Sequence, residues 1–236
     1  VLLSGCGVID VEDESVILSN EQMEVTFLPC AGGKIISIKD ASGNEFLSRS
    51  DRPYRKRSLG SSYGETEFDG IDECFPSMGG CEYPAEPFIG RPTGDHGEIC
   101  HLPWKRIPGE GVVLQVEGVN FPYVFTRKAT LSGKSLILDY TVKNMGDAPL
   151  YHAYVFHPLF KGETGCRVEL PPETDVTVLY STKGFLGKMR SKAKIGEIKD
   201  ADGKTFQHKM FTKNLGRFYK FVVGKLDRGE AILTYK

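Results

Sequence analysis

The densest cluster of reactive side chains in this 236-residue sequence is Asp95-His96-Gly97-Glu98, which Trp104 follows closely. A carboxylate beside an imidazole can fix the tautomer of the ring and raise its basicity, as a general acid or base requires. An indole offers a flat apolar face that suits the C–H side of a sugar ring. We therefore predict a polar binding site that uses Asp95, His96, Glu98 and Trp104. The alternative is a well-bonded turn in which Asp95 caps local amides and His96 fills a gap.

A second candidate is His157, which precedes Pro158 in a run that also contains His152. Residues five apart on a strand point to opposite faces, so both histidines cannot line one site unless a bulge intervenes. Pro158 favours an extended backbone at His157, from which the side chain can reach into a groove. His157 is therefore a candidate to line a binding groove. The alternative is a satisfied core or surface histidine.

Zinc binding is a third interpretation of the same region, because Cys74, Cys81, His96, Cys100 and His101 lie close together in sequence. These residues show neither the C-x₂-C nor the H-x₃-H spacing that is typical of zinc sites. We therefore predict no metal site.

The overall charge argues against two classes of partner. Lys and Arg total 30 and Asp and Glu total 31, so no strong field is available to hold a nucleic acid. The longest apolar runs, such as Val112-Val113-Leu114, are far shorter than the roughly 20 residues that cross a bilayer. We expect no nucleic acid and no membrane span, and a small neutral ligand fits this balance better.

The cysteines and the N-terminus bear on the compartment. The six cysteines are too sparse for a disulfide-stapled scaffold. Leu3-Ser4-Gly5-Cys6 resembles the small-residue pattern before a lipid-modified cysteine, but the basic and apolar regions of a signal peptide do not precede it. We predict a cytoplasmic location. A lipoprotein or periplasmic location is the alternative if Cys6 lies in a lipobox.

Alternation of apolar and polar residues recurs along the chain and favours strands over helices. The expected strands are 22–28, 34–39, 112–119, 123–131, 135–143, 150–157, 167–170, 176–180, 218–223 and 231–235. The stretch 48–108 is rich in Gly, Pro and charge, and its aromatic residues indicate a packed functional loop. Many strands joined by short turns predict an all-β fold, a large antiparallel β-sandwich that forms a single domain over residues 1–236.

Several segments, taken in order, resemble the aldose 1-epimerase (galactose mutarotase) superfamily. They are Asn20 with Met23-Glu24-Val25, Leu28-Pro29 with Gly32 to Ile38, Asp72-Glu73-Cys74-Phe75-Pro76, Asp95-His96-Gly97-Glu98 with Trp104, 126–131, 138–144 and His157-Pro158-Leu159-Phe160. The loop motifs resemble an uncharacterised mutarotase-like branch in particular.

This resemblance implies a galactose mutarotase-like supersandwich that binds a monosaccharide or a sugar terminus and interconverts its anomers without a cofactor. The histidine matching His157 would act as general acid on the ring oxygen, and the one matching His96 would bind or polarise the sugar. A carboxylate base takes the proton from the anomeric hydroxyl. Each positioned acid or base is typically worth about 10²–10⁴-fold in rate.

The sequence departs from the family at the base, a glutamate on a late strand for which no residue here is a match. The chain is either a fragment truncated at its C-terminus before that strand or a complete protein without the base. Glu230 is the last carboxylate and is not assigned the role, whereas Glu98 is a possible substitute. Arg91 and Arg127 are candidate ligands for sugar hydroxyls or phosphate, with ordinary surface pairing as the alternative.

Two other functions stay open beside the enzyme. One is a non-catalytic carbohydrate-binding sandwich, which the missing base and the aromatic-rich loop would suit. The other is an accessory β-domain of a larger polysaccharide-degrading enzyme.

Overall fold

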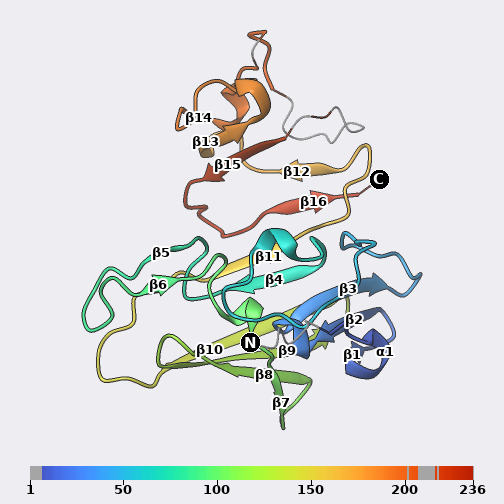
Figure 1. Ribbon diagram of the computed structural model, residues 1–236. Helices are drawn as coiled ribbons and strands as arrows, with labels where there is room; N and C mark the ends of the chain where they lie inside the picture. The colour runs from blue at the N-terminus through green and yellow to red at the C-terminus, as the bar shows by residue number, and fades with distance from the viewer. Residues whose placement is uncertain (1–6, 201, 207–215, 217, 236) are drawn as a thin grey trace. The chain divides into compact units, whose positions relative to one another are not determined.

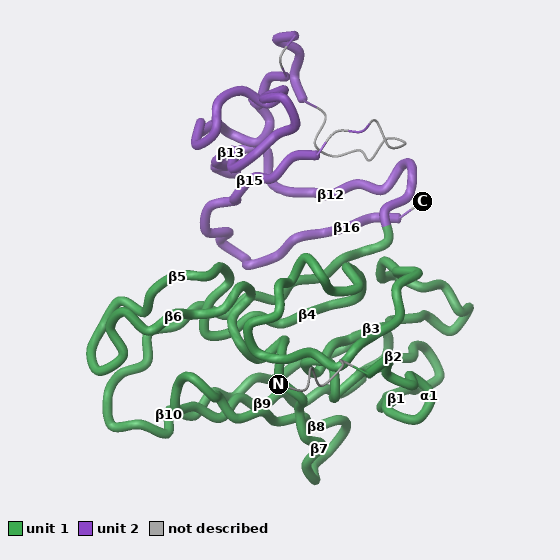
Figure 2. Tube along the Cα trace, in the orientation of Figure 1, with its two compact units in different colours: residues 1–161 green, residues 162–236 purple. Residues whose placement is uncertain are grey.

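The computed structural model describes residues 7–200, 202–206, 216 and 218–235, so the prediction for Cys6 lies outside the described residues. The chain divides into two compact units, Val1–Lys161 and Gly162–Lys236 (Figure 2). That the whole chain forms a single domain stays a prediction.

Unit 1 contains a five-stranded sheet in the order β1-β2-β3-β4-β11 (Figure 1). Its strands are β1 (Val16–Ser19), β2 (Met23–Leu28), β3 (Lys34–Asp40), β4 (Ile71–Cys74) and β11 (Val155–Pro158). All neighbouring strands pair antiparallel. Between β2 and β3, Gly32 has φ +78°, and a Cβ there would come within 2.3 Å of the Cys100 carbonyl oxygen. Only glycine fits this turn, which brings the loop around Cys100 against the sheet.

A second, four-stranded antiparallel sheet of unit 1 has the order β10-β9-β8-β7. Its strands are β7 (Lys105–Ile107), β8 (Val112–Glu117), β9 (Tyr123–Ser132) and β10 (Ser135–Asn144). Tyr123, Phe125, Arg127 and Ala129 alternate along β9 as its buried face. Apolar side chains of both sheets share one core. The predicted all-β antiparallel sandwich is therefore confirmed.

The stretch 48–108 packs closely against the sheets, as its aromatic residues predict. It contains β4, β5 (Cys81–Glu82), β6 (Pro92–Thr93), β7 and the 3₁₀ turns η2 (Tyr63–Glu65) and η3 (Ile99–His101). The expectation of a wholly irregular loop is wrong at β4, which lies inside the larger sheet between β3 and β11. This strand was hidden because it reads Ile-Asp-Glu-Cys, and buried strands seldom carry two adjacent carboxylates.

The remaining helical elements are short. Within residues 7–161 there is one α-helix, α1 (Val11–Glu14), which Asp10 caps by accepting a hydrogen bond from the Glu12 amide, and a further 3₁₀ turn, η1 (Pro29–Ala31). Unit 2 has η4 (Thr182–Gly184) and η5 (Ile195–Glu197). In the part of the chain that the structure describes, no helix has the length and apolar character that a membrane span needs.

The described residues of unit 2 form two small antiparallel sheets. In one, β12 (Arg167–Glu169) pairs with β16 (Ile232–Thr234). In the other, β13 (Asp175–Ser181) lies between β14 (Lys192–Lys194) and β15 (Tyr219–Val223). The unit has its own buried cluster, which includes Val176, Val178, Leu186 and Ile195.

Candidate functional site

The pairing of β4 with β11 places His157 beside a buried carboxylate. The antiparallel register sets His157 opposite Asp72 and Phe156 opposite Glu73. Because directly opposed residues point to the same face, His157 and Asp72 share one face of the sheet, and Glu73 points to the other. Asp72 is fully buried, whereas His157 is only partly buried.

Tyr63 connects these two side chains. Its hydroxyl oxygen lies 2.9 Å from Oδ2 of Asp72 and 3.2 Å from Nδ1 of His157. The tyrosine is set on the short turn η2, where the Ser62 hydroxyl accepts a hydrogen bond from the Gly64 amide. Tyr63 is 4% exposed, so its hydroxyl must find its partners inside the protein.

His96 reaches the same tyrosine from another loop. Its ring stacks on that of Tyr63 with centroids 3.7 Å apart, and its centroid lies 5.4 Å from that of His157. Nδ1 of His96 lies 2.9 Å from Oδ1 of Asp95. The structure thus brings Asp95, His96 and His157 together, as the sequence predicted, and adds Tyr63 between the two histidines.

The loop holds His96 in an unusual backbone conformation. His96 has φ +62°, a backbone conformation that residues other than glycine rarely adopt. Its amide donates to the Met78 carbonyl at 2.7 Å. Gly97 follows with φ +73°, and a Cβ there would approach the Phe75 carbonyl oxygen to 2.3 Å. Nε2 of His101 lies 3.0 Å from the Asp95 carbonyl oxygen. Burial lowers the pKa of His101, which keeps the ring neutral as a donor to that carbonyl.

Buried cations surround Asp72. Lys34 Nζ lies 2.8 Å from Oδ2 of Asp72 and 3.5 Å from Oδ1 of Asp69, and no part of its side chain is exposed. Arg57 contacts Oδ1 of Asp72 and Oε2 of Glu67, each at 2.8 Å. Burial alone would raise the pKa of Asp72, but the ion pairs with Lys34 and Arg57 outweigh it and lower the pKa to about 2. Asp72 is therefore an anion at neutral pH.

The pKa of Tyr63 shifts in the opposite direction to that of Asp72. Burial, and then the negative charge of Asp72, raises the pKa of Tyr63 well above its usual range. Tyr63 is therefore a neutral phenol that can donate one hydrogen bond and accept others.

Two of the predicted ligands lie elsewhere, in the interior of the sandwich. Arg127 is 1% exposed, pairs with Glu73 at 2.8 Å and donates to the Gly33 carbonyl at 2.6 Å. Trp104 is 4% exposed, and its Nε1 donates to the Ile99 carbonyl at 2.9 Å. Its ring packs on Gly33 and beneath the guanidinium of Arg127. A sugar could contact either side chain only after the core opened.

Glu98 and Arg91 are also engaged away from the histidines. Glu98 is 2% exposed, and its Oε2 accepts hydrogen bonds from the amides of Val119 and Asn120 at 3.3 and 3.0 Å. Arg91 is exposed, donates to the Asn120 carbonyl and lies 4.7 Å from the centre of the Phe88 ring. In this structure Oε2 of Glu98 fixes a turn, and no described hydrogen bond joins the carboxylate to His96.

Phe68 is a feature of the site that local sequence did not indicate. It is 48% exposed, and its ring centre lies 5.4 Å from that of Tyr63 in an edge-to-face arrangement. Its φ of +53° is unusual for a bulky side chain and places strain on the backbone beside the histidines. An exposed aromatic ring next to polar groups is a suitable wall for a sugar.

The cysteines near this region are not arranged for metal binding. Burial raises the pKa of Cys74 to about 12, and burial also raises the pKa of Cys100. Both are therefore protonated thiols in this structure. Within the described ranges, no three His, Cys, Asp or Glu side chains are placed to hold a metal ion.

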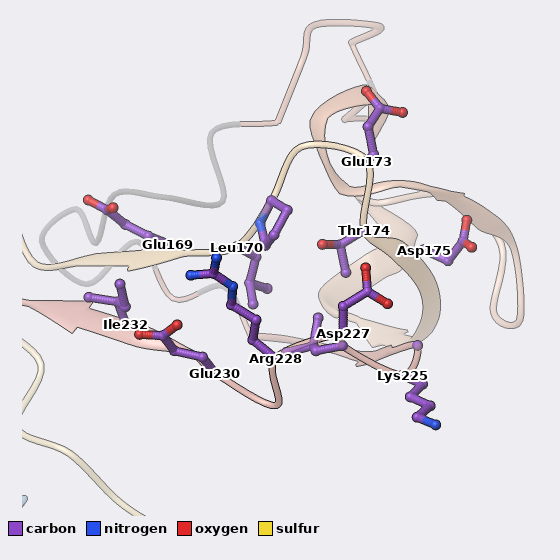
Figure 3. Close-up of a pocket in the computed structure, with 13 residues that line it drawn as sticks. Glu169, Leu170, Glu173, Thr174, Asp175, Lys225, Asp227, Arg228, Glu230 and Ile232 are labelled. Carbon is purple, nitrogen blue, oxygen red and sulfur yellow. The ribbon is translucent and has the colours of Figure 1, made fainter.

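Unit 2 contains a pocket of about 660 Å³ (Figure 3). Acidic side chains are in excess in its lining, which includes Glu169, Glu173, Asp175, Asp227 and Glu230 beside Lys225 and Arg228. Leu170 and Leu226 add apolar surface. None of the predicted site residues lines this pocket. The histidine pair His96 and His157 belongs to unit 1.

No protein-family model and no curated protein sequence matches the chain. Solved structures do match its fold. The Slr1438 protein from Synechocystis sp. PCC 6803 has a TM-score of 0.57 and 18% identity over 80% of this chain and 64% of its own. A galactose mutarotase-like protein from Lactobacillus casei has a TM-score of 0.51 and 18% identity over 70% of this chain and 55% of its own.

These matches define the class of fold. The chain has the fold of galactose mutarotase-like proteins, as the sequence resemblance implied. A TPR-domain containing protein from Parabacteroides distasonis also matches, with a TM-score of 0.51 and 18% identity over 70% of this chain and 27% of its own. The chain spans less than two thirds of the length of each of these structures.

Proposed function

We propose that unit 1 binds a monosaccharide or a sugar terminus at His96 and His157 and interconverts its anomers, as aldose 1-epimerases do. The observation that carries this proposal is the convergence of the two imidazoles on one tyrosine, with ring centroids 5.4 Å apart. Two imidazoles at this spacing can contact neighbouring oxygens of one small polyol. The fold, which galactose mutarotase-like proteins share, supports the same proposal.

In this proposal the histidines divide the work on the sugar. His157 donates a proton to the ring oxygen while the bond from that oxygen to C1 breaks, and the anomeric hydroxyl gives its proton to a water molecule. Rotation about C1–C2 presents the other face of the aldehyde, and closure reverses both proton transfers. His96, held by Asp95, donates a hydrogen bond to a sugar oxygen. Phe68, rather than the enclosed Trp104, offers an exposed aromatic face beside them.

The motif residues favour the uncharacterised mutarotase-like branch. Asp72 and His96 belong to the two loop motifs that resemble this branch, and both contact Tyr63 in the structure. That motifs distant in sequence meet at one side chain supports a shared role for them. Membership of the branch is part of this proposal.

Nuclear magnetic resonance saturation transfer between the two anomers tests the enzyme. Wild-type protein should accelerate exchange of at least one aldose among glucose, galactose and their 6-phosphates, and His157→Ala should lower this rate by about 10²-fold or more. His152→Ala is the matched control, because His152 is exposed and its Nδ1 lies 3.0 Å from the Leu150 carbonyl oxygen. Equal rates in the His157 and His152 variants would contradict the assignment of the acid.

A non-catalytic sugar-binding site is the second candidate. The position of Glu98 favours it, because this carboxylate is 2% exposed and its Oε2 accepts from the amides of Val119 and Asn120. Ligand-detected binding of the same sugars would separate the two functions. Binding without exchange supports the second candidate, and the absence of both binding and exchange excludes both functions for these sugars.

A further inference from the structure

The Tyr63 hydroxyl lies between an anion and an imidazole, so the direction of its single proton can be worked out. Asp72 can only accept hydrogen bonds, because its ion pairs hold the carboxyl in the ionised form. If Tyr63 donated to His157, its oxygen would face Oδ2 of Asp72 at 2.9 Å with no proton between them. That arrangement is repulsive. The phenol proton therefore lies on the Asp72 side.

The direction of the second hydrogen bond follows from the first. With its proton given to Asp72, the Tyr63 oxygen can only accept from Nδ1 of His157, 3.2 Å away. Nδ1 must then carry a proton in the neutral ring as well as in the protonated ring. In the neutral ring the unprotonated nitrogen is then Nε2.

The same tyrosine also sets the distance between the histidines. The face of its ring carries His96, with 15° between the two ring planes, while its hydroxyl holds His157. Tyr63 is itself fixed by Asp72, which Lys34 and Arg57 hold from two other segments. The buried network of hydrogen bonds and ion pairs therefore fixes the orientation of the two imidazoles.

We propose that Tyr63 is a positioning residue that fixes His157 in the Nδ1–H tautomer and makes Nε2 its reactive nitrogen. The tautomer itself follows from the geometry, whereas its consequence for sugar chemistry rests on the proposed function. An acid on the ring oxygen would then act through Nε2–H. A base role in the reverse step would use the Nε2 lone pair.

Side-chain ¹⁵N spectra of the histidines test the tautomer directly. At a pH above the titration of His157, wild-type protein should show a protonated Nδ1 and an unprotonated Nε2, assigned by the loss of these signals in His157→Asn. Tyr63→Phe keeps the ring that carries His96 and removes only the hydroxyl, so the Nε2–H tautomer should gain population. Wild-type His157 protonated at Nε2, or no change in Tyr63→Phe, would overturn the proposal.

Tyr54→Phe is the matched control. Tyr54 is also a buried tyrosine, and its hydroxyl donates to Oδ2 of Asp69 in the same network at 2.7 Å. No described hydrogen bond or ring contact joins Tyr54 to His157. Its loss should leave the His157 spectrum unchanged. A tautomer change of equal size in both variants would show that general loosening of the network, and not the Tyr63 hydroxyl, moves the proton.

Anomer exchange gives a second, separable result. If wild-type protein exchanges anomers, Tyr63→Phe should lower kcat by about 10-fold or more and leave KM nearly unchanged, within the ~10²–10⁴-fold that a positioned acid contributes. A raised KM with unchanged kcat would instead indicate a sugar-binding role and contradict positioning. If wild-type protein exchanges no sugar, the proposed function fails, while the ¹⁵N spectra still decide the tautomer.

Discussion

Replacing Lys34 with methionine removes a cation from the most deeply buried part of the network while nearly keeping the length of the side chain. Lys34 stands at the start of β3 with no exposed side-chain surface, and it pairs with both Asp72 and Asp69. Lys39→Met on the same strand is the matched control. Its ammonium lies 3.8 Å from Glu24, and both side chains are more than 40% exposed.

The two substitutions should lower the free energy of unfolding by amounts that differ several-fold. Breaking a buried pair from one side leaves a charge without its partner and typically costs about 3–5 kcal/mol. Because Arg57 still contacts Asp72 at 2.8 Å, we expect the low end of that range for Lys34→Met, about 3 kcal/mol. An exposed pair is worth about 0–1 kcal/mol, so Lys39→Met should cost less than about 1 kcal/mol.

The pH dependence gives the prediction a second readout. The pKa of Asp72 falls from its ordinary 3.8 to about 2 in the folded chain. The ionised carboxylate therefore stabilises the fold above pH 3.8, by about 2 kcal/mol, and this stabilisation is lost as the pH falls toward 2. Without Lys34 the pKa of Asp72 rises, so the stability difference between wild type and Lys34→Met should narrow over the same pH window.

Urea denaturation followed by tryptophan fluorescence measures both effects, because Trp104 is buried in unit 1 and is the single tryptophan of the sequence. The free energy of unfolding of the two variants and of wild type would be compared at pH 7 and at intervals down to pH 2.5. A cost below about 1 kcal/mol for Lys34→Met at pH 7 would refute the reasoning, as would a gap that stays constant on acidification.

Two further substitutions separate packing from ligand contact. Trp104→Ala should cost about 3–5 kcal/mol in urea denaturation followed by circular dichroism, because a buried aromatic side chain is deleted, and sugar titrations of the folded protein should give an unchanged Kd. A weaker Kd at unchanged stability would show that the indole contacts the sugar. Phe68→Ala should instead weaken sugar binding by roughly 2–10-fold, the ~0.5–1.5 kcal/mol of an aromatic contact, with little loss of stability. The same Kd for wild type and Phe68→Ala would exclude the aromatic wall.

Regular alternation made most of the sandwich predictable from sequence. The hairpin of β9 and β10 agrees with its predicted ranges to within a residue at each end, because each strand carries a steady period of two around a short Gly133 turn. β4 could not be found this way. Its two carboxylates pair with Lys34, Arg57 and Arg127, which come from other segments of the chain. No local sequence pattern indicates such partners.

Of the candidate site, only His96, His157 and Asp95 could be predicted from the sequence. A histidine beside an aspartate and a histidine before a proline are local patterns, and both led to residues that meet in the structure. Trp104 shows the limit of local reasoning, because its burial depends on Gly33, against which the ring packs. Tyr63 carried no signal beyond being an aromatic residue in a loop. Its importance comes from Asp72 and His157, which the fold brings to it from two strands.

The two carboxylates of β4 also bear on the order in which the protein can assemble. Glu73 needs Arg127 from the other sheet, and Asp72 needs Lys34 from β3 and Arg57 from the loop, so the strand is fully neutralised only when all three segments have arrived. Contacts between segments so far apart in sequence form late, because the chain must close long loops first. β11, which carries His157, pairs with this strand. The histidine site is thus a product of the closed sandwich, and a partly folded chain would hold the same residues without their arrangement.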